Sequence, residues 1–196
     1  AEREILIRIA RPDDLDSISR LYSNYMFDSH LSRFGDSFVK KYLKVILKSK
    51  NCITLVAVED QAAGFIVAAF NCSKILCELF FNIEFSSSCV KQVLAHPCLA
   101  FKSLGLILYP FNSGIRGVNS ELLFIAVEPG YRRRNLGASL IKKVLSLMKD
   151  NEIKKIKVST LVANEAVNAL LKKLGFELKK TFKLFKNCAH LYVYEI

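Results

Sequence analysis

The 196-residue sequence has no long uncharged run and no recognisable leader. No eighteen consecutive residues are free of charge, and the most apolar region, residues 90–108, is interrupted by Lys91, Pro97 and Lys102. A membrane-spanning helix needs about 20 predominantly apolar residues, so we expect no membrane span. The first residues carry neither an apolar signal core nor a cleavage pattern, and we therefore expect a cytoplasmic protein.

The six cysteines include no C-x-x-C pair, which is the spacing typical of zinc sites. Scattered cysteines are typical of a reducing compartment, where they serve as small apolar residues. We therefore expect no metal site, no structural disulfides and mostly buried cysteines. The sequence also lacks internal repeats and the G-x-S-x-G motif that would indicate a serine nucleophile.

The length and composition indicate a globular chain, with 52% apolar and 24% charged residues. This length supports one substantial core and is short for two ordinary domains, so we expect a single domain over residues 1–196 with a helical insertion over 73–119. The net charge of +11 indicates either a solvated basic surface or an anionic partner. Because aromatic residues are not interleaved with the lysines, a phosphate-rich cofactor is favoured over nucleic acid.

Hydrophobic periodicity predicts a mixed α/β chain. Residues 60–61 form a short polar turn between two apolar strands, which is typical of a hairpin, and residues 73–119 are expected to hold one to three helices. The predicted strands are 4–10, 52–59, 62–70, 121–127, 153–160, 177–184 and 190–196. The predicted helices are 11–25, 36–49, 136–148 and 165–174.

The most informative segment is residues 122–141, in which a buried strand leads through a basic turn into a helix. The first turn of a helix leaves backbone N–H groups unpaired, and the helix dipole favours a phosphate there, with arginine side chains adding charged contacts. The small residues Gly137 and Ala138 would let a pyrophosphate approach the backbone. A basic turn between a strand and a helix can equally be solvent-facing, so both interpretations stay open on physical grounds.

The run V-x-P-x-Y-R-x-x-N-L-G-A at residues 127–138 resembles the acetyl-CoA signature of the GNAT superfamily, R/Q-x-x-G-x-G/A after a strand. Asn135 stands where the first glycine of that signature sits, and asparagine tolerates left-handed backbone better than most residues. Residues 164–176 resemble the second GNAT element, N-x-x-A-x-x-x-Y-x-x-x-G-F. Val167 and Leu171 occupy its alanine and tyrosine positions.

The resemblance implies a GNAT fold, a mixed and mostly antiparallel sheet of six to seven strands flanked by helices, with a helical insertion between strands 3 and 4. It also implies an N-acetyltransferase that passes an acetyl group from acetyl-CoA to a primary amine by direct attack in a ternary complex. The acceptor stays open among a small molecule, an amino sugar and a protein amino group, and so does a homodimer. The implied cofactor-binding residues are Ile125, Ala126, Val127, Arg132, Arg133, Arg134, Asn135, Leu136, Gly137, Ala138, Ser139 and Asn164.

The sequence offers two catalytic candidates. Glu121 is similar to the strand glutamate that acts as a base through water in the histone acetyltransferases of the superfamily. Leucine at 171 cannot donate a proton. His190, Tyr192 and Tyr194 alternate on the last strand and so face the same side, where one of them could be the substitute acid; Tyr192 is our candidate. The competing interpretations are an exposed strand end for Glu121 and strand packing for Tyr192. Acceptor specificity is expected in residues 73–119 and 32–38, where the family varies.

Two other functions stay open. A GNAT domain that binds acyl-CoA or a partner without turnover would fit asparagine at 135 and leucine at 171. A basic nucleic-acid-binding module would fit the net charge and predicts a steeply salt-dependent affinity for DNA or RNA.

Overall fold

The computed structural model describes residues 5–26, 31–95, 115, 117–184 and 187–196. The strands are β1 (Leu6–Ile9), β2 (Cys52–Val58), β3 (Ala62–Ala69), β4 (Glu121–Val127), β5 (Lys155–Leu161), β6 (Glu177–Leu184) and β7 (Asn187–Glu195). The helices are α1 (Leu15–Tyr25), α2 (Asp36–Lys48), α3 (Cys72–Phe81), α4 (Ile83–Ala95), α7 (Leu136–Asp150) and α8 (Glu165–Lys173). Short 3₁₀ turns lie at Pro12–Asp14 (η1), Ser32–Phe34 (η2) and Pro129–Tyr131 (η3).

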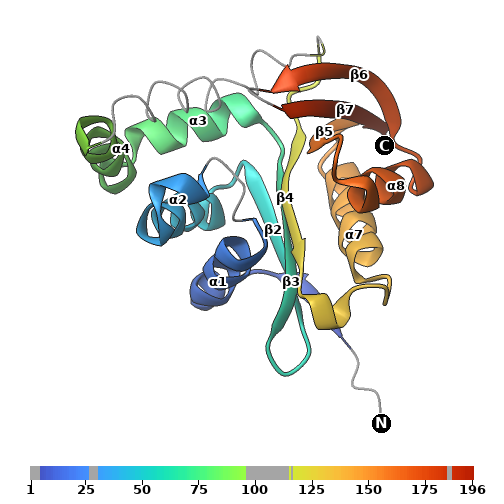
Figure 1. Ribbon diagram of the computed structural model, residues 1–196, viewed down its shortest axis with the longest axis horizontal. Coiled ribbons are helices and arrows are strands. Elements are labelled where there is room, and N and C mark those ends of the chain that lie inside the picture. The colour runs from blue at the N-terminus through green and yellow to red at the C-terminus, as the bar shows by residue number, and fades with distance from the viewer. Residues whose placement is uncertain (1–4, 27–30, 96–114, 116, 185–186) are drawn as a thin grey trace.

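Within these residues, seven strands form one sheet in the order β1-β2-β3-β4-β5-β7-β6. Neighbouring strands are antiparallel except β4 and β5, which are parallel. Helices α1 and α2 lie on one side of the sheet, and α7 and α8 lie on the other (Figure 1). The predicted fold class is confirmed, including the helices between the third and fourth strands.

The two faces of the sheet carry separate apolar cores. One core joins α1, α2, α3 and α4 to the sheet through side chains such as Tyr22, Phe38 and Phe65. The other joins α7 and α8 to the opposite face through Leu140, Leu171 and similar residues. β3 is buried along its whole length because it lies between both cores, which explains its continuous apolar sequence.

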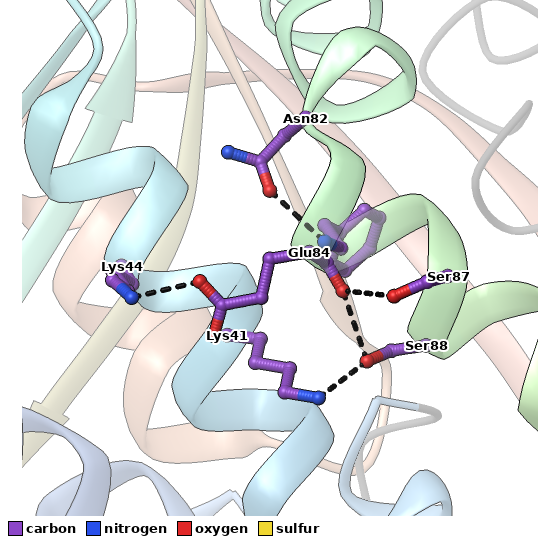
Figure 2. A network of polar contacts seen from close by, with 7 residues as sticks. Lys41, Lys44, Asn82, Glu84, Ser87 and Ser88 are labelled. Atoms are coloured by element: carbon purple, nitrogen blue, oxygen red, sulfur yellow. Dashed lines mark hydrogen bonds and ion pairs between the residues drawn. The ribbon is translucent and has the colours of Figure 1, made fainter.

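Polar contacts fasten the inserted helix α4 to α2. Figure 2 shows the Lys41 ammonium donating to Ser88 Oγ at 2.6 Å and the Lys44 ammonium paired with Glu84 at 2.7 Å. The Asn82 side chain accepts from the Phe85 N–H at 2.9 Å and so caps the start of α4. Ser88 is buried, so its contact to Lys41 lies inside the interface between the two helices.

Two simpler expectations concern the membrane and the cysteines. Among the described residues, no helix is long and apolar enough to cross a membrane. The expectation that most cysteines are buried is wrong for the described ones, because Cys72 is buried whereas Cys77 and Cys188 are exposed. Cys77 lies on the exposed side of α3, and Cys188 is the second residue of β7.

The first prediction concerns the contact between β3 and β4. A Cβ atom at Gly64 would lie 2.9 Å from the Ala126 carbonyl oxygen, whereas one at Gly130 would meet nothing within 4 Å. Gly64→Ala should therefore lower the free energy of unfolding by about 2 kcal/mol, because the backbone must shift. Gly130→Ala should change it by less than about 0.5 kcal/mol. Urea unfolding of both variants checks this, and equal stabilities would contradict it.

Candidate active site

The parallel strands β4 and β5 pair only at one end. Their register covers Glu121 with Lys157 and Leu122 with Val158, and the Lys157 N–H donates to the Ser120 carbonyl at 3.1 Å. Beyond these pairs both strands continue without pairing to each other, although β4 stays paired to β3 and β5 to β7. A register shift places Leu123 as an extra residue on β4 where the two strands part. The sheet therefore opens between β4 and β5.

Backbone amides of β4 line this opening. The Glu128 N–H donates to the Ala63 carbonyl on β3 at 2.9 Å. Because successive residues of a strand direct their amides to opposite edges, the N–H groups of Val127 and Ile125 face the β5 side. The structure thus places two of the predicted cofactor-binding residues with donors toward the gap, whereas Ala126 directs its amide to β3.

A buried ion pair closes the end where β4 and β5 meet. The Lys157 ammonium lies 3.5 Å from Glu121 Oε2, and the two side chains are 2% and 7% exposed. The Cys72 thiol donates to the same carboxylate oxygen at 3.7 Å. Burial raises the pKa of Glu121, and the Lys157 charge opposes that rise. The expectation of an exposed strand end at Glu121 is therefore wrong. The sequence gives no local signal for Lys157 as its partner, because the two residues lie on different strands.

The basic turn after β4 is held by contacts to the rest of the protein. The Glu59 carboxylate accepts from the Tyr131 hydroxyl at 2.8 Å and lies 3.9 Å from the Arg134 guanidinium. The Glu59 contact to Tyr131 raises the pKa of that phenol. Glu59 belongs to the turn between β2 and β3, so this hairpin fixes the shape of the basic turn. Sequence reasoning missed Glu59.

The other two arginines differ in their contacts. Arg132 Nε donates to the Val127 carbonyl at 3.1 Å, and its guanidinium lies 5.5 Å from the Tyr25 ring centre. Arg133 is exposed and has φ of 63°, in the left-handed region. Two of the three predicted phosphate-binding arginines, Arg132 and Arg134, thus contact protein groups.

The start of α7 presents unpaired amides. Asn135 has φ of 59°, so it adopts the left-handed conformation for which a glycine is usual. The Ser139 N–H donates to the Asn135 carbonyl at 3.0 Å, whereas the structure records no acceptor in the described part of the chain for the N–H groups of Leu136, Gly137 and Ala138. Three predicted residues therefore form an amide cluster of the kind that binds phosphate.

A pocket of about 410 Å³ lies beside this helix start. Its lining residues are Asn135, Ala138, Ser139, Lys142, Leu170, Lys173 and Leu174, which come from α7 and α8 and the residues next to them. The two lysines were not predicted as site residues, since their meeting depends on how the two helices pack. Gly137 does not line the pocket. A Cβ atom at this position would lie 3.4 Å from Leu170 Cδ2, so the small size of Gly137 serves the packing of α8 on α7.

The last predicted residues lie around α8. The Asn164 side chain accepts from the Val167 N–H at 3.4 Å and caps that helix. Tyr192 is fully buried in the same apolar core as Leu171, and its hydroxyl has no hydrogen-bond partner among the described residues. Burial raises the pKa of Tyr192. Its role as the acid stays a prediction.

The two segments expected to set acceptor specificity contact each other. The Gln92 side chain of α4 donates to the Phe34 carbonyl in η2 at 3.0 Å. The Phe38 ring lies 5.0 Å from that of Phe34 and 5.1 Å from that of Phe85 on α4. The inserted helix and the segment before α2 thus form one surface. Among the described residues, no group of His, Cys, Asp and Glu side chains could hold a metal ion.

Comparison with solved structures identifies the fold. NAA60 from Arabidopsis thaliana in complex with acetyl-CoA has a TM-score of 0.62 at 18% identity, covering 98% of this chain and 99% of that one. The ribosomal-protein-S18-alanine N-acetyltransferase from Escherichia coli has a TM-score of 0.62 at 12% identity, with coverage of 98% and 94%. A GNAT-family acetyltransferase from Streptococcus pneumoniae has a TM-score of 0.61 at 16% identity, with coverage of 98% and 100%. No curated protein matches the sequence.

The parted parallel strands and the basic turn leading to a helix start define an acyltransferase of this fold. The family model described as "Acetyltransferase (GNAT) family" matches residues 15–176. The chain therefore belongs to the GNAT acetyltransferase family, and the activity of that family is N-acetyl transfer.

The second prediction tests the buried ion pair. Lys157→Met should lower the free energy of unfolding by about 3 kcal/mol at neutral pH, because it leaves the Glu121 carboxylate buried without its cation. The double variant Glu121→Gln/Lys157→Met should recover at least half of that loss, since no charge then remains buried. Urea unfolding of the two single variants and the double variant gives the coupling free energy.

The pH dependence of this loss has a defined sign. Without the Lys157 charge the folded-state pKa of Glu121 rises further, so folding favours the protonated acid. The loss in Lys157→Met should thus be small near about pH 4 and grow as the pH rises through the folded-state pKa. A loss independent of pH would show that Lys157 acts through packing alone.

Proposed function

We propose that this enzyme binds acetyl-CoA between β4 and β5 and transfers the acetyl group to a primary amine by direct attack in a ternary complex. The observation that carries the proposal is the alignment of two sets of donors along one strand and the helix that follows it. The unpaired amides at the start of α7 suit a pyrophosphate, and the inward N–H groups of β4 suit a polar chain and a thioester. Glu121 lies at the closed end of the same strand.

Each chemical step has a candidate group. The Glu121 carboxylate takes a proton from the acceptor ammonium through an intervening water, and the free amine attacks the thioester carbon. The N–H groups of Ile125 and Val127 stabilise the oxyanion of the tetrahedral intermediate. The nitrogen of this intermediate then loses its second proton to solvent, the carbon–sulfur bond breaks, and the neutral amide forms as CoA leaves as a thiolate. Tyr192 is the candidate acid for that thiolate.

The cysteine in contact with Glu121, Cys72, supports direct attack over a covalent acyl-enzyme. Burial and the Glu121 charge raise the pKa of Cys72 to about 12. A thiol with this pKa stays protonated at neutral pH, whereas nucleophilic cysteine requires the thiolate. Cys72 is therefore unsuited to carry the acetyl group.

The third prediction tests where the phosphates bind. Ser139 lines the pocket at the start of α7, and Ser146 is an exposed serine on the same helix outside that lining. Ser139→Glu should weaken CoA binding at least about tenfold, because it adds a negative charge beside the phosphates. Ser146→Glu, the matched control with the same charge change, should alter the dissociation constant by less than about twofold. Isothermal calorimetry with CoA measures both.

The outcomes separate the proposal from its alternatives. Equal affinities for CoA in the two variants would place the phosphates elsewhere, and no heat with wild-type protein would remove the cofactor assignment. Binding of CoA without thiol release across a broad amine panel would identify a family member that binds acyl-CoA without turnover. That second function is favoured by one observation, the buried leucine at 171 in place of a proton donor.

The fourth prediction tests the base. The rate should increase with pH as Glu121 loses its proton, with a midpoint above the ordinary 4.5 because burial raises this pKa. Glu121→Gln should lower kcat about 100-fold or more and remove that limb of the pH profile. The measurement is CoA thiol release with a saturating amine between about pH 5 and pH 9. An unchanged profile in Glu121→Gln would exclude this carboxylate as the base.

A further inference from the structure

The pocket beside α7 carries two cationic side chains in addition to the neutral backbone amides at the helix start. Lys142 projects from the second turn of α7, and Lys173 projects from the last turn of α8, so the two ammonium groups approach the pocket from different helices. Both lysines are exposed, and neither has an ion pair or hydrogen bond recorded within the described residues. None of the seven lining residues is acidic. Two like charges at one pocket repel, so an anion between them is favoured.

The amides and the lysines lie at different depths along α7. Lys142 follows the three unpaired amides of residues 136–138 by four to six residues, which is about 6–9 Å along the helix axis. Lys173 adds a cation from the facing helix. The region can therefore bind two anionic groups, one at the helix amides and one between the two lysines.

Three of the other five lining residues are apolar. Leu170 and Leu174 lie on the α8 side of the pocket, near Lys173 in sequence, and Ala138 lies on the α7 side. A volume of about 410 Å³ exceeds the need of a single phosphate and lies in the range of small-ligand sites. An apolar wall, a cationic pair and a separate amide cluster together match a nucleoside that carries phosphates at two positions.

We infer that Lys142 and Lys173 form a second anion subsite that binds the 3′-phosphate of CoA and makes the enzyme discriminate against cofactors without that phosphate. This inference rests on the proposed use of acetyl-CoA, whose pyrophosphate occupies the amides at the start of α7. The 3′-phosphate is a phosphate monoester with nearly two negative charges at neutral pH. Two ammonium groups balance that charge, and neither has to leave a protein partner to do so.

The fifth prediction compares two double variants that remove the same charge. Lys142→Ala/Lys173→Ala removes the proposed subsite, whereas Lys143→Ala/Lys172→Ala removes the neighbouring exposed lysines on the same two helices, which do not line the pocket. Calorimetry with CoA and with 3′-dephospho-CoA measures four dissociation constants for the variants and two for the wild type. Both pairs lower the net charge from +11 to +9, since each removes two lysines. The two double variants should therefore attract anions equally through their net charge.

The wild type should bind CoA about tenfold more tightly than 3′-dephospho-CoA, as expected for two charged contacts at an open site. Lys142→Ala/Lys173→Ala should bind both ligands with the affinity that the wild type has for 3′-dephospho-CoA. Lys143→Ala/Lys172→Ala should keep the tenfold preference. In turnover, the pocket variant should raise KM for acetyl-CoA and leave kcat unchanged, because the subsite does not touch the thioester.

Three results would overturn the inference. Equal affinity of the wild type for both ligands would show that the 3′-phosphate makes no contact. A preference retained in Lys142→Ala/Lys173→Ala would assign it to other residues, and a preference lost equally in both double variants would assign it to net charge. Failure of the proposed function looks different, because the wild type would then bind neither ligand.

Discussion

The short parallel contact between β4 and β5 is the constraint on which the site depends. Parallel strands normally continue their ladder, yet here the pairing ends after two residue pairs while both strands extend further. The other edge of each strand stays paired, β4 to β3 and β5 to β7. The gap is thus held open by the antiparallel ladders on either side, and the inward amides of β4 have no strand to satisfy them. Unpaired main-chain donors in a protein interior are costly unless water or a ligand meets them.

The buried pair of Glu121 and Lys157 holds one end of the gap, and Glu121 is also the base of the proposed mechanism. It lies where β4 and β5 meet, so it holds the closed end of the gap together. The same burial raises the pKa of Glu121 toward the range in which a carboxylate is an effective base. Burial makes this carboxylate more basic, and the Lys157 ammonium opposes part of that effect. The residue proposed for proton transfer is therefore also part of the junction that shapes the gap.

Most of the fold follows from local sequence patterns. The hairpin of β2 and β3 lies within one residue of its predicted bounds, and α2 and α8 lie close to theirs, because apolar periodicity and turn residues specify such elements locally. The left-handed Asn135 and the amides after it also follow from the motif. In contrast, tertiary contacts between residues distant in sequence are not encoded by any periodicity. These are the contacts of Glu59, the contact of Lys157 with Glu121, and the approach of Lys142 and Lys173 to one pocket.

The arginines illustrate the same limit. A triplet of arginines before a helix predicts phosphate contacts, but Arg132 and Arg134 contact Val127 and Glu59 in the folded chain. These contacts fix the turn that precedes the helix amides. The free cations at the pocket are lysines instead, supplied by two helices that pack through Gly137 and Leu170. The composition predicts an excess of positive charge that could attract a phosphate. Which lysines and arginines would supply that charge depends on tertiary packing.

The leucine at 171 is compatible with catalysis because of the leaving group itself. An alkyl thiol has a pKa near about 8.5, so CoA can leave as a thiolate with little protonation, unlike the amine that attacks. The proposed mechanism therefore depends less on a general acid than it would with a poorer leaving group. Tyr192 lies in the same apolar core as Leu171, and its hydroxyl has no partner among the described residues. A buried hydroxyl of this kind costs stability, and an acceptor such as a departing sulfur would supply the missing hydrogen bond. That unsatisfied hydroxyl supports the proposal that Tyr192, rather than Leu171, supplies the proton in this step.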